Sequence, residues 1–442
     1  MARVARTQAR SEMIIGVLEE AFDELMQTDP QAFRVKYRKM AADPFAFFRG
    51  AACLFYADVT KKRDGWTDER ANGIWIHGDL HVENFGTYMN SDGRLVFDIN
   101  DFDEAYIGHF SWDLRRFVAS LALMGWQKAL PEEEVRALIA KYVRAYLSQV
   151  NHYVRSDAND DDFALHLDNT TGPVLEVLLE ARGYRRSAML DAMTRVDDHV
   201  RVFQEDATVR RLGRDERRKV LRAFESYLET IPESKRFDRD LFYDVRDVVG
   251  KTGFGIGSAG LPAYNFLVEG YTQSLDNDVV LSMKQANVPA LSRFDDTGQV
   301  EHFFEHEGHR TVVSQRALQV HTDPLLGYTN LDGVGYVVSE VSPYEADLDW
   351  SNINEPTDMA KVVEMLGRAT AKVHCASDED SEQDLVNFQV EAAIAEVLDG
   401  RRREFTDDMV EFGIGYALTT RRDHGLFVDA FREGRIGGVA AT

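Results

Sequence analysis

Apolar side chains at helical spacing fill most of the first sixty residues. Two sets repeat at intervals of three or four positions, one before and one after Pro44: Met13, Ile14, Val17, Leu18 and Phe22, then Phe45, Phe48, Ala52 and Phe55. Such spacing places apolar residues on one face of a helix, and proline suits the first turn of a new helix. Residues 11–58 are therefore predicted to form helices that are separated near Pro44.

Short strands interrupt this helical pattern before it resumes. Gly73 to Ile76 predicts a strand that runs directly into His77-Gly78-Asp79, and Leu95 to Phe97 predicts another. From about residue 112 to residue 240 the pattern is helical again, with charged faces. We assign residues 1–240 to a mainly helical lobe.

Strands and glycines dominate the chain from about residue 245. The predicted strands are Tyr264 to Val268, Val279 to Met283 and Gly335 to Val341. We assign residues 245–345 to a β-rich lobe, which also holds a helix at about Arg310 to Val320. Helical periodicity from Asp358 to Cys375 and again after Glu382 makes residues 355–442 the C-terminal helices that complete the helical lobe. The predicted fold class is a two-lobed α+β protein.

Composition narrows the class of partner. The net charge is −24, which works against binding a nucleic acid, because clustered Lys and Arg residues hold phosphate backbones. No stretch approaches the roughly 18 apolar residues of a spanning helix, and the N-terminus lacks the apolar core of a secretory signal. Cys53 and Cys375 suggest neither a disulfide framework nor a metal knuckle. We expect a cytoplasmic protein that binds neither nucleic acid nor membrane, and we make no prediction of its oligomeric state.

The strongest chemical signal is a pair of short motifs about twenty residues apart. They are His77-Gly-Asp-Leu-His-Val-Glu-Asn84 and Asp98-Ile-Asn-Asp101-Phe-Asp103. Phosphoryl transfer needs a carboxylate that accepts the proton of an attacking hydroxyl, and an amide and a second carboxylate that hold metal ions. We predict that Asp79 is the catalytic base and that Asn84 and Asp101 bind Mg²⁺, which prefers oxygen ligands.

Two other interpretations of these motifs remain open. The first makes residues 77–81 a turn that is capped by its own Asp and His side chains. The second makes His77, Asp79 and His81 a transition-metal site, since imidazole and carboxylate suit Zn or Fe. The metal site leaves Asn84 and Asp101 without a role.

A glycine-rich segment and a lysine supply the second signal. Gly255, Gly257, Ser258 and Gly260 lie between two predicted strands, and Lys284 ends a strand one hairpin later. Glycines let backbone N–H groups approach phosphates, and a lysine on an adjacent strand pairs with phosphate oxygens. A dinucleotide-binding turn would instead require a helix directly after the glycines. An alternating strand follows here, so we predict that this segment and Lys284 bind the phosphates of ATP.

The two signals occur in the reverse of the order that is usual in kinases. The glycine loop and the lysine normally precede the catalytic loop, whereas here they follow it by about 170 residues. A circularly permuted chain explains this order, because folds tolerate permutation when the joined ends lie near each other at the surface. The segment Leu366 to His374, which resembles the helix before the catalytic loop of small-molecule kinases, agrees with permutation. The alternative is that one of the two motifs is accidental.

The sequence resembles an uncharacterised bacterial family, domain of unknown function 2252, which is grouped with the protein-kinase-like superfamily. The resemblance extends nearly from end to end, and the motifs that carry it are specific. They include the glycine loop, the Lys284 strand and five further segments: Tyr37-Arg-Lys-Met-Ala-Ala-Asp-Pro-Phe-Ala-Phe-Phe-Arg-Gly-Ala-Ala52, His77-Gly-Asp-Leu-His-Val-Glu-Asn-Phe-Gly86, Val96-Phe-Asp-Ile-Asn-Asp-Phe-Asp-Glu-Ala105, Trp112-Asp-Leu-Arg-Arg116 and Gln315-Arg316.

This resemblance implies a two-lobed protein-kinase-like fold with ATP between the β-rich and helical lobes. A wider similarity to aminoglycoside and choline kinases, which have HGD where protein kinases have HRD, implies that Asp113 anchors the catalytic loop from the following helix. Asp98 is either a further metal ligand or a turn cap. The partner of Lys284 is undecided, because the helix at Arg310 to Val320 offers Gln315 rather than an acid.

The combined expectation is a Mg-ATP-dependent phosphotransferase that acts on a hydroxyl of an unknown small molecule or protein. Two alternatives are an enzyme of the same fold that transfers AMP, and a catalytically silent nucleotide-binding or scaffold protein. The acidic surface favours a cationic small molecule or a basic protein segment as the acceptor, since complementary fields speed encounter.

Overall fold

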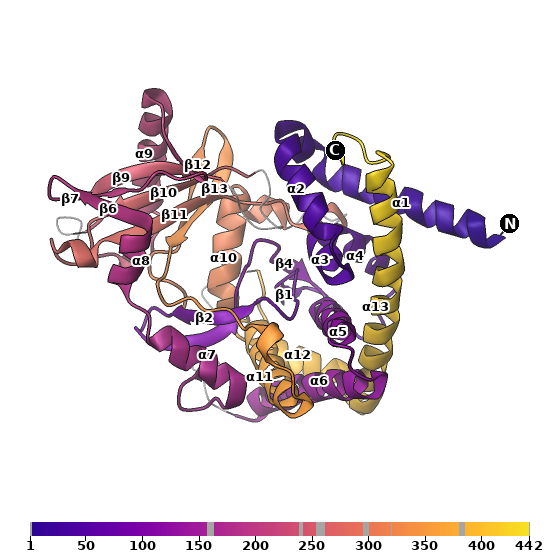
Figure 1. Ribbon diagram of the computed structural model, residues 1–442. Helices are drawn as coiled ribbons and strands as arrows, with labels where there is room; N and C mark the ends of the chain where they lie inside the picture. Colours follow the sequence, from indigo (N-terminus) through magenta and orange to yellow (C-terminus); the bar gives the residue numbers. More distant parts are fainter. Residues whose placement is uncertain are drawn as a thin grey trace.

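A six-stranded antiparallel sheet and a set of long helices make up most of this computed structural model (Figure 1). The structure describes residues 2–156, 163–237, 242–252, 261–294, 300–319, 321–379 and 385–441. The sheet has the strand order β12-β13-β11-β10-β9-β8, and every neighbouring pair is antiparallel. Its strands are β8 (Val209–Arg211), β9 (Val245–Lys251), β10 (Ala263–Val268), β11 (Val279–Gln285), β12 (Gly327–Leu331) and β13 (Val334–Glu340).

Apolar side chains cover both faces of this sheet, because successive residues of a strand point to opposite faces. In β10, Phe266 packs in one buried cluster with Phe224 of α9 (Arg214–Leu228). The next residue, Leu267, packs in another cluster with Leu190 of α8 (Arg186–Met193). The helix α10 (Glu307–Gln319) contacts β12 and β13.

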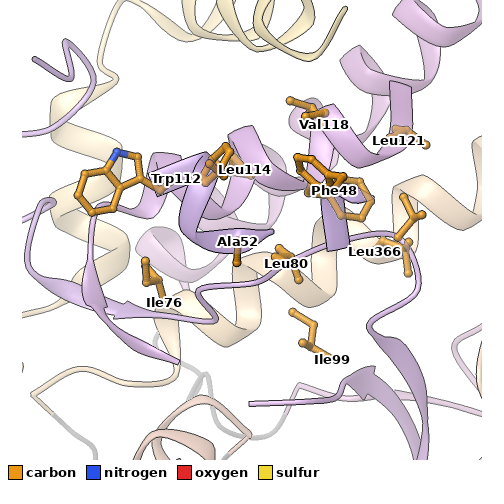
Figure 2. Packing of buried hydrophobic residues seen from close by; sticks show 14 of the residues in the cluster. Phe48, Ala52, Ile76, Leu80, Ile99, Trp112, Leu114, Val118, Leu121 and Leu366 are labelled. Atoms are coloured by element: carbon orange, nitrogen blue, oxygen red, sulfur yellow. The ribbon is translucent and has the colours of Figure 1, made fainter. Parts of the chain in front are cut away.

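Helices from both ends of the chain form the largest hydrophobic cluster. They are α1 (Ala2–Thr28), α2 (Pro30–Met40), α3 (Pro44–Gly50), α4 (Ala52–Val59), α5 (Phe110–Gln127), α6 (Glu132–Arg155), α7 (Gly172–Arg182), α11 (Pro356–Cys375), α12 (Val390–Val397) and α13 (Arg402–Arg432). Here α11 packs on α6, and α13 packs on α5. Figure 2 shows Leu80, from the predicted catalytic loop, in the same cluster as Phe48, Leu114 and Leu366.

Two small antiparallel strand pairs bring the predicted site together. One joins β1 (Ile74–Ile76) to β4 (Tyr106–Gly108), and the other joins β2 (Phe85–Met89) to β3 (Leu95–Ile99). Because Ile76 lies opposite Tyr106 and Phe85 lies opposite Ile99, the loops 77–84 and 100–105 leave neighbouring strands and run side by side. The other short strands are β5 (Leu165–His166), which pairs with β3, and β6 (Thr194–Asp197), which pairs with β7 (Val200–Phe203).

The structure confirms the mixed α+β class. The predicted strands at 73–76, 95–97, 264–268, 279–283 and 335–341 and the predicted helices at 310–320 and 358–375 are present, with ends that shift by a few residues. No helix within the described ranges is both long enough and apolar enough to cross a bilayer.

The sheet extends further toward the N-terminus than the predicted boundary at residue 245. Strand β8 pairs with β9, and the Tyr227 hydroxyl of α9 donates a hydrogen bond of 2.6 Å to the carbonyl of Leu325, just before β12. Residues 209–228, which the sequence assigned to the helical lobe, therefore pack on the sheet. The helical period of α9 reveals an apolar face, but it does not reveal which surface that face covers.

Gly78 lies in the loop that follows β1. Its φ is +81°, a conformation that L side chains rarely adopt, and a Cβ at this position would lie 2.0 Å from the carbonyl oxygen of Glu104. Both the backbone conformation and the close approach of loop 100–105 therefore require glycine.

We expect Gly78→Ala to lower the free energy of unfolding by at least about 3 kcal/mol, because it adds a backbone clash to conformational strain. The matched control is Gly93→Ala, since Gly93 has φ +71° but nothing within 4 Å of its Cβ position. The control should lose only about 1 kcal/mol. Urea unfolding measures both losses, and equal losses would show that the contact with Glu104 is unimportant.

Candidate functional site

The carboxylate of Asp113 holds the loop after β1 in place. Asp113 lies in the first turn of α5. Its carboxylate accepts hydrogen bonds from the backbone N–H of His77 (2.7 Å) and from that of Gly78 (3.0 Å). On its other side His374 of α11 contributes Nε2 at 3.1 Å, and both side chains are fully buried. Burial opposes ionisation, but the hydrogen bond from His374 and those from the loop outweigh it, so the pKa of Asp113 lies below its ordinary value.

Asp79 is paired with a buried arginine. Arg116 of α5 donates its Nε to Oδ1 of Asp79 at 2.5 Å and a guanidinium N–H to the carbonyl of Phe48 at 3.1 Å. The guanidinium also lies 4.3 Å from the centre of the Phe48 ring. Burial raises the pKa of Asp79, and Arg116 opposes this rise. Oδ2 of Asp79 accepts no hydrogen bond from the described residues, so it is available to a ligand.

The two predicted metal ligands, Asn84 and Asp101, both line one cleft. The amide nitrogen of Asn84 donates to the backbone carbonyl of Asp79 at 3.0 Å, which leaves its amide oxygen for a ligand. Asp101 has φ +61°, and its carboxylate has no hydrogen-bond partner among the described residues. Such strain in a non-glycine residue is typical of functional sites.

The surroundings of Asp101 in the cleft raise the pKa of its carboxyl group. The surrounding protein, and then the neighbouring carboxylate of Asp103, raise the pKa of Asp101. Solvent nevertheless reaches the residue through the cleft, so the electrostatic repulsion is partly screened. A cation between the two carboxylates would remove this repulsion and favour the ionised form.

Lys284 contacts the loop that carries Asp101. Its Nζ lies 2.5 Å from Oδ2 of Asp103, so an acid of the loop itself is the partner that the sequence left undecided. Burial lowers the pKa of Lys284, but the carboxylates of Asp103 and Asp101 outweigh it and raise that pKa overall. The acid of α10 is not the partner of Lys284, because Glu307 accepts a hydrogen bond from Arg310. Gln315 of the same helix lines the cleft.

Arg310 and Lys372 are buried cations that sequence reasoning missed. Arg310 donates to the carbonyls of Asp103 (2.9 Å) and Ala105 (2.6 Å), and so ties α10 to the loop. Lys372 of α11 pairs with Asp98 at 2.7 Å. The pairing gives Asp98 a structural partner and makes a role as a metal ligand unnecessary. The sequence pattern does not reveal either pairing, because each partner is distant in sequence, although Lys372 lies within the segment Leu366 to His374.

The cleft has a volume of about 670 Å³ and lies between the sheet and these loops. Besides Asp101 and Asp103, the acidic residues that line it are Glu83, Asp323, Glu340, Glu345 and Asp347. Burial raises the pKa of Glu340 to about 7 although Arg186 opposes this rise, and burial together with neighbouring carboxylates raises the pKa of Glu345 to about 7. The basic lining residues of the described chain are Arg49 and Lys284. An anionic ligand therefore needs an accompanying cation.

The predicted glycine loop lies outside the described residues. Gly255, Gly257, Ser258 and Gly260 all belong to the segment 253–260. The strands on either side of it, β9 and β10, pair antiparallel with Lys251 opposite Ala263, as the strand-turn-strand prediction requires. Strand β10 also pairs with β11, which carries Lys284.

The transition-metal interpretation of residues 77–81 fits the geometry poorly. His77 uses both ring nitrogens on backbone groups, with Nδ1 3.3 Å from the N–H of Asp79 and Nε2 2.9 Å from the carbonyl of Asn100. Across the described ranges, no group of three or more His, Cys, Asp or Glu side chains is arranged to hold a metal ion.

One sequence family covers nearly all of these residues. The family described as "Uncharacterized protein conserved in bacteria (DUF2252)" matches residues 28–430. The chain belongs to this family. No curated protein and no solved structure matches the sequence of this chain. The family match confirms that part of the predicted resemblance, while the relation to protein kinases stays a prediction.

Asp113→Asn should lower the free energy of unfolding by about 2–4 kcal/mol at pH 7, because two buried N–H groups lose an ionised acceptor. The folded pKa of Asp113 is depressed, so its contribution is present above the unfolded pKa of about 3.9 and is lost as the pH falls through the folded pKa. The difference between wild type and variant should therefore shrink below about pH 4.

Urea unfolding at intervals between pH 7 and pH 3 measures this difference. Asp168→Asn is the control, because the side chain of Asp168 is 94% exposed, and it should change stability little at any pH. A loss for Asp113→Asn that stays constant with pH would contradict an ionised anchor.

Proposed function

We propose that this protein binds Mg-ATP in the cleft and transfers a phosphoryl group to a hydroxyl of a small molecule or protein. The observation that supports this function is the meeting of two distant segments in one place. Asn84 and Asp101, from the loops beside β1, line the same cleft as Lys284 of the sheet. A cavity next to it is lined by both Asp79 and Asp101.

The donor groups at this place fit Mg²⁺. Asn84 offers an amide oxygen and Asp101 an unpaired carboxylate, and Mg²⁺ is usually held by one or two such protein oxygens together with substrate phosphates and waters. A site of this kind does not require a cluster of three acidic or imidazole ligands. The bound ion would neutralise phosphate charge, which the acidic lining of the cleft makes necessary.

The chain's own residues would supply positioning and proton transfer. The oxygen of the acceptor hydroxyl bonds to the γ-phosphorus, the bond from that phosphorus to the β–γ bridging oxygen breaks, and ADP leaves. The hydroxyl proton passes to Oδ2 of Asp79, while Arg116 holds Oδ1 and fixes the orientation of the carboxylate. Lys284 exchanges its contact with Asp103 for phosphate oxygens.

A permuted kinase-like arrangement agrees with the packing of the two ends of the chain. Arg10 of α1 bonds to Asp423 of α13 at 2.5 Å, and Glu19 accepts a hydrogen bond of 2.6 Å from the N–H of Gly437. The first and last helices therefore lie together, as is expected of the two ends that form where a permuted fold is opened. His374 of α11 also reaches the Asp113 anchor, so a helix late in the sequence supports the early loop.

We expect ATP to stabilise the wild-type protein by about 2–3 kcal/mol at a hundredfold excess over its dissociation constant, and only when Mg²⁺ is present. Asp101→Ala should abolish this stabilisation because it removes the unpaired carboxylate. Asp92→Ala, on the exposed turn before β3, is the control and should behave as wild type. Thermal shift and calorimetry with and without Mg²⁺ measure the effect. Binding that needs no Mg²⁺, or no binding at all, would contradict the proposal.

Asp79→Asn should keep Mg-ATP binding but lower the transfer rate by about 10²–10⁴-fold, the usual contribution of a general base. The measurement is the transfer of label from γ-labelled ATP to a set of hydroxyl compounds. Full activity of the variant would refute the base assignment. A parallel assay with α-labelled ATP tests the alternative, since label in the product would then identify AMP transfer.

A further inference from the structure

A second, smaller cavity, of about 50 Å³, adjoins the cleft. It shares Arg49, Asp101 and Asp103 with the cleft and is also lined by Asp79. Helices α1 to α4 supply much of its wall. We call this cavity the acceptor crevice, because it would hold an acceptor within reach of Asp79 if the cleft holds the nucleotide.

Lys36 of α2 is a buried cation that lines the acceptor crevice without a charged partner. The residue is 4% exposed, and no oxygen of the described chain forms a hydrogen bond or ion pair with its ammonium group. Nζ lies 4.0 Å from the centre of the Phe22 ring, which lines the crevice too. Burial lowers the pKa of Lys36 to about 8, so the charged form is present at neutral pH and is costly.

The other charged groups of the acceptor crevice already have partners. Glu104 accepts hydrogen bonds from Ala290 N–H (2.5 Å) and from the amide of Asn287 (2.9 Å). Arg293 donates to the carbonyl of Ala21 at 3.0 Å. The remaining pairs are Asp79 with Arg116, Arg49 with Glu83, and Asp103 with Lys284. Glu104 and Arg293 are bonded only to neutral groups, and the carboxylate of Glu104 also acts on Lys36 and raises its pKa. With Asp101 assigned to Mg²⁺, Lys36 and Arg293 therefore carry one positive charge more than Glu104 balances, and an anionic group of a ligand would compensate it.

We propose that the acceptor crevice binds a small hydroxylated anion, with its carboxylate or phosphate on Lys36 and its hydroxyl toward Asp79. The role of the hydroxyl rests on the phosphotransfer proposed above, whereas the anion site stands on the geometry of Lys36 alone. The expected acceptor is then an anion, the opposite of the cationic acceptor that the overall charge favours.

Calorimetry without nucleotide tests the anion site with four matched probes: glycerol 3-phosphate, glycerate, glycerol and choline. The two anions should bind the full-length protein at least ten times more tightly than glycerol or choline, and their relative affinity decides between phosphate and carboxylate. Lys36→Met should weaken anion binding at least tenfold. Lys39→Met, on the same helix but exposed, should leave it unchanged. Equal binding by Lys36→Met, preference for choline, or binding of no probe would overturn the proposal.

A second measurement separates a ligand contact from a structural role. Without ligand, Lys36→Met should raise the melting temperature, because methionine replaces an unpaired buried charge at similar size. A variant that melts lower or fails to fold would show that Lys36 is satisfied inside the protein, and would overturn the proposal.

Failure of the anion site is distinguishable from failure of the phosphotransfer proposal. Lys36→Met should retain the Mg-dependent stabilisation by ATP, and Asp101→Ala should retain anion binding while it loses that stabilisation. Anion binding by a wild-type protein that ignores ATP would support the crevice and refute phosphotransfer. ATP binding without anion binding would do the reverse.

Discussion

The buried carboxylate of Asp113 is the contact on which the geometry of the site depends. A charge without access to water is costly unless several donors surround it. Here α5 carries the acid, and the donors come from two other segments: the loop gives the N–H groups of His77 and Gly78, and α11 gives His374. Because two adjacent backbone groups bind the two carboxylate oxygens, the direction in which the chain leaves β1 is fixed. The position of Asp79, one residue later, follows from it.

Loop 100–105 makes two further contacts that differ in kind, one with α10 and one with the sheet. Arg310 binds the carbonyls of Asp103 and Ala105, which are groups that no ligand would displace. Lys284 binds the carboxylate of Asp103 at the cleft surface, where phosphate oxygens compete for the same ammonium group. The structure thus combines a permanent anchor and an exchangeable one, so a ligand can engage Lys284 without releasing the loop from α10.

The sequence predicts the elements of this fold better than their partners. Periodicity reveals β10, β11 and α11 because it depends on local spacing, and the motif around Asp79 identifies the candidate site because its residues are close in sequence. The pairs of Lys284 with Asp103, Lys372 with Asp98 and Arg310 with loop carbonyls link positions about 180 to 270 residues apart. No local pattern encodes such pairs, since each is created by the tertiary packing of β11, α10 or α11. The placement of α9 on the sheet escapes prediction for the same reason.

Net charge is the weakest guide to the ligand. A charge of −24 describes a surface whose field is screened beyond about 8 Å at physiological salt. Inside a cavity, the few groups in contact with the ligand decide instead, because they act in a medium of lower dielectric constant. The cleft and the acceptor crevice differ in this respect although they share Asp101: one has an excess of carboxylates and requires a cation, while the other retains the unpaired ammonium of Lys36. Two neighbouring cavities with opposite unmet charge suit two different ligands, and the carboxylate of Asp79 lies where they adjoin.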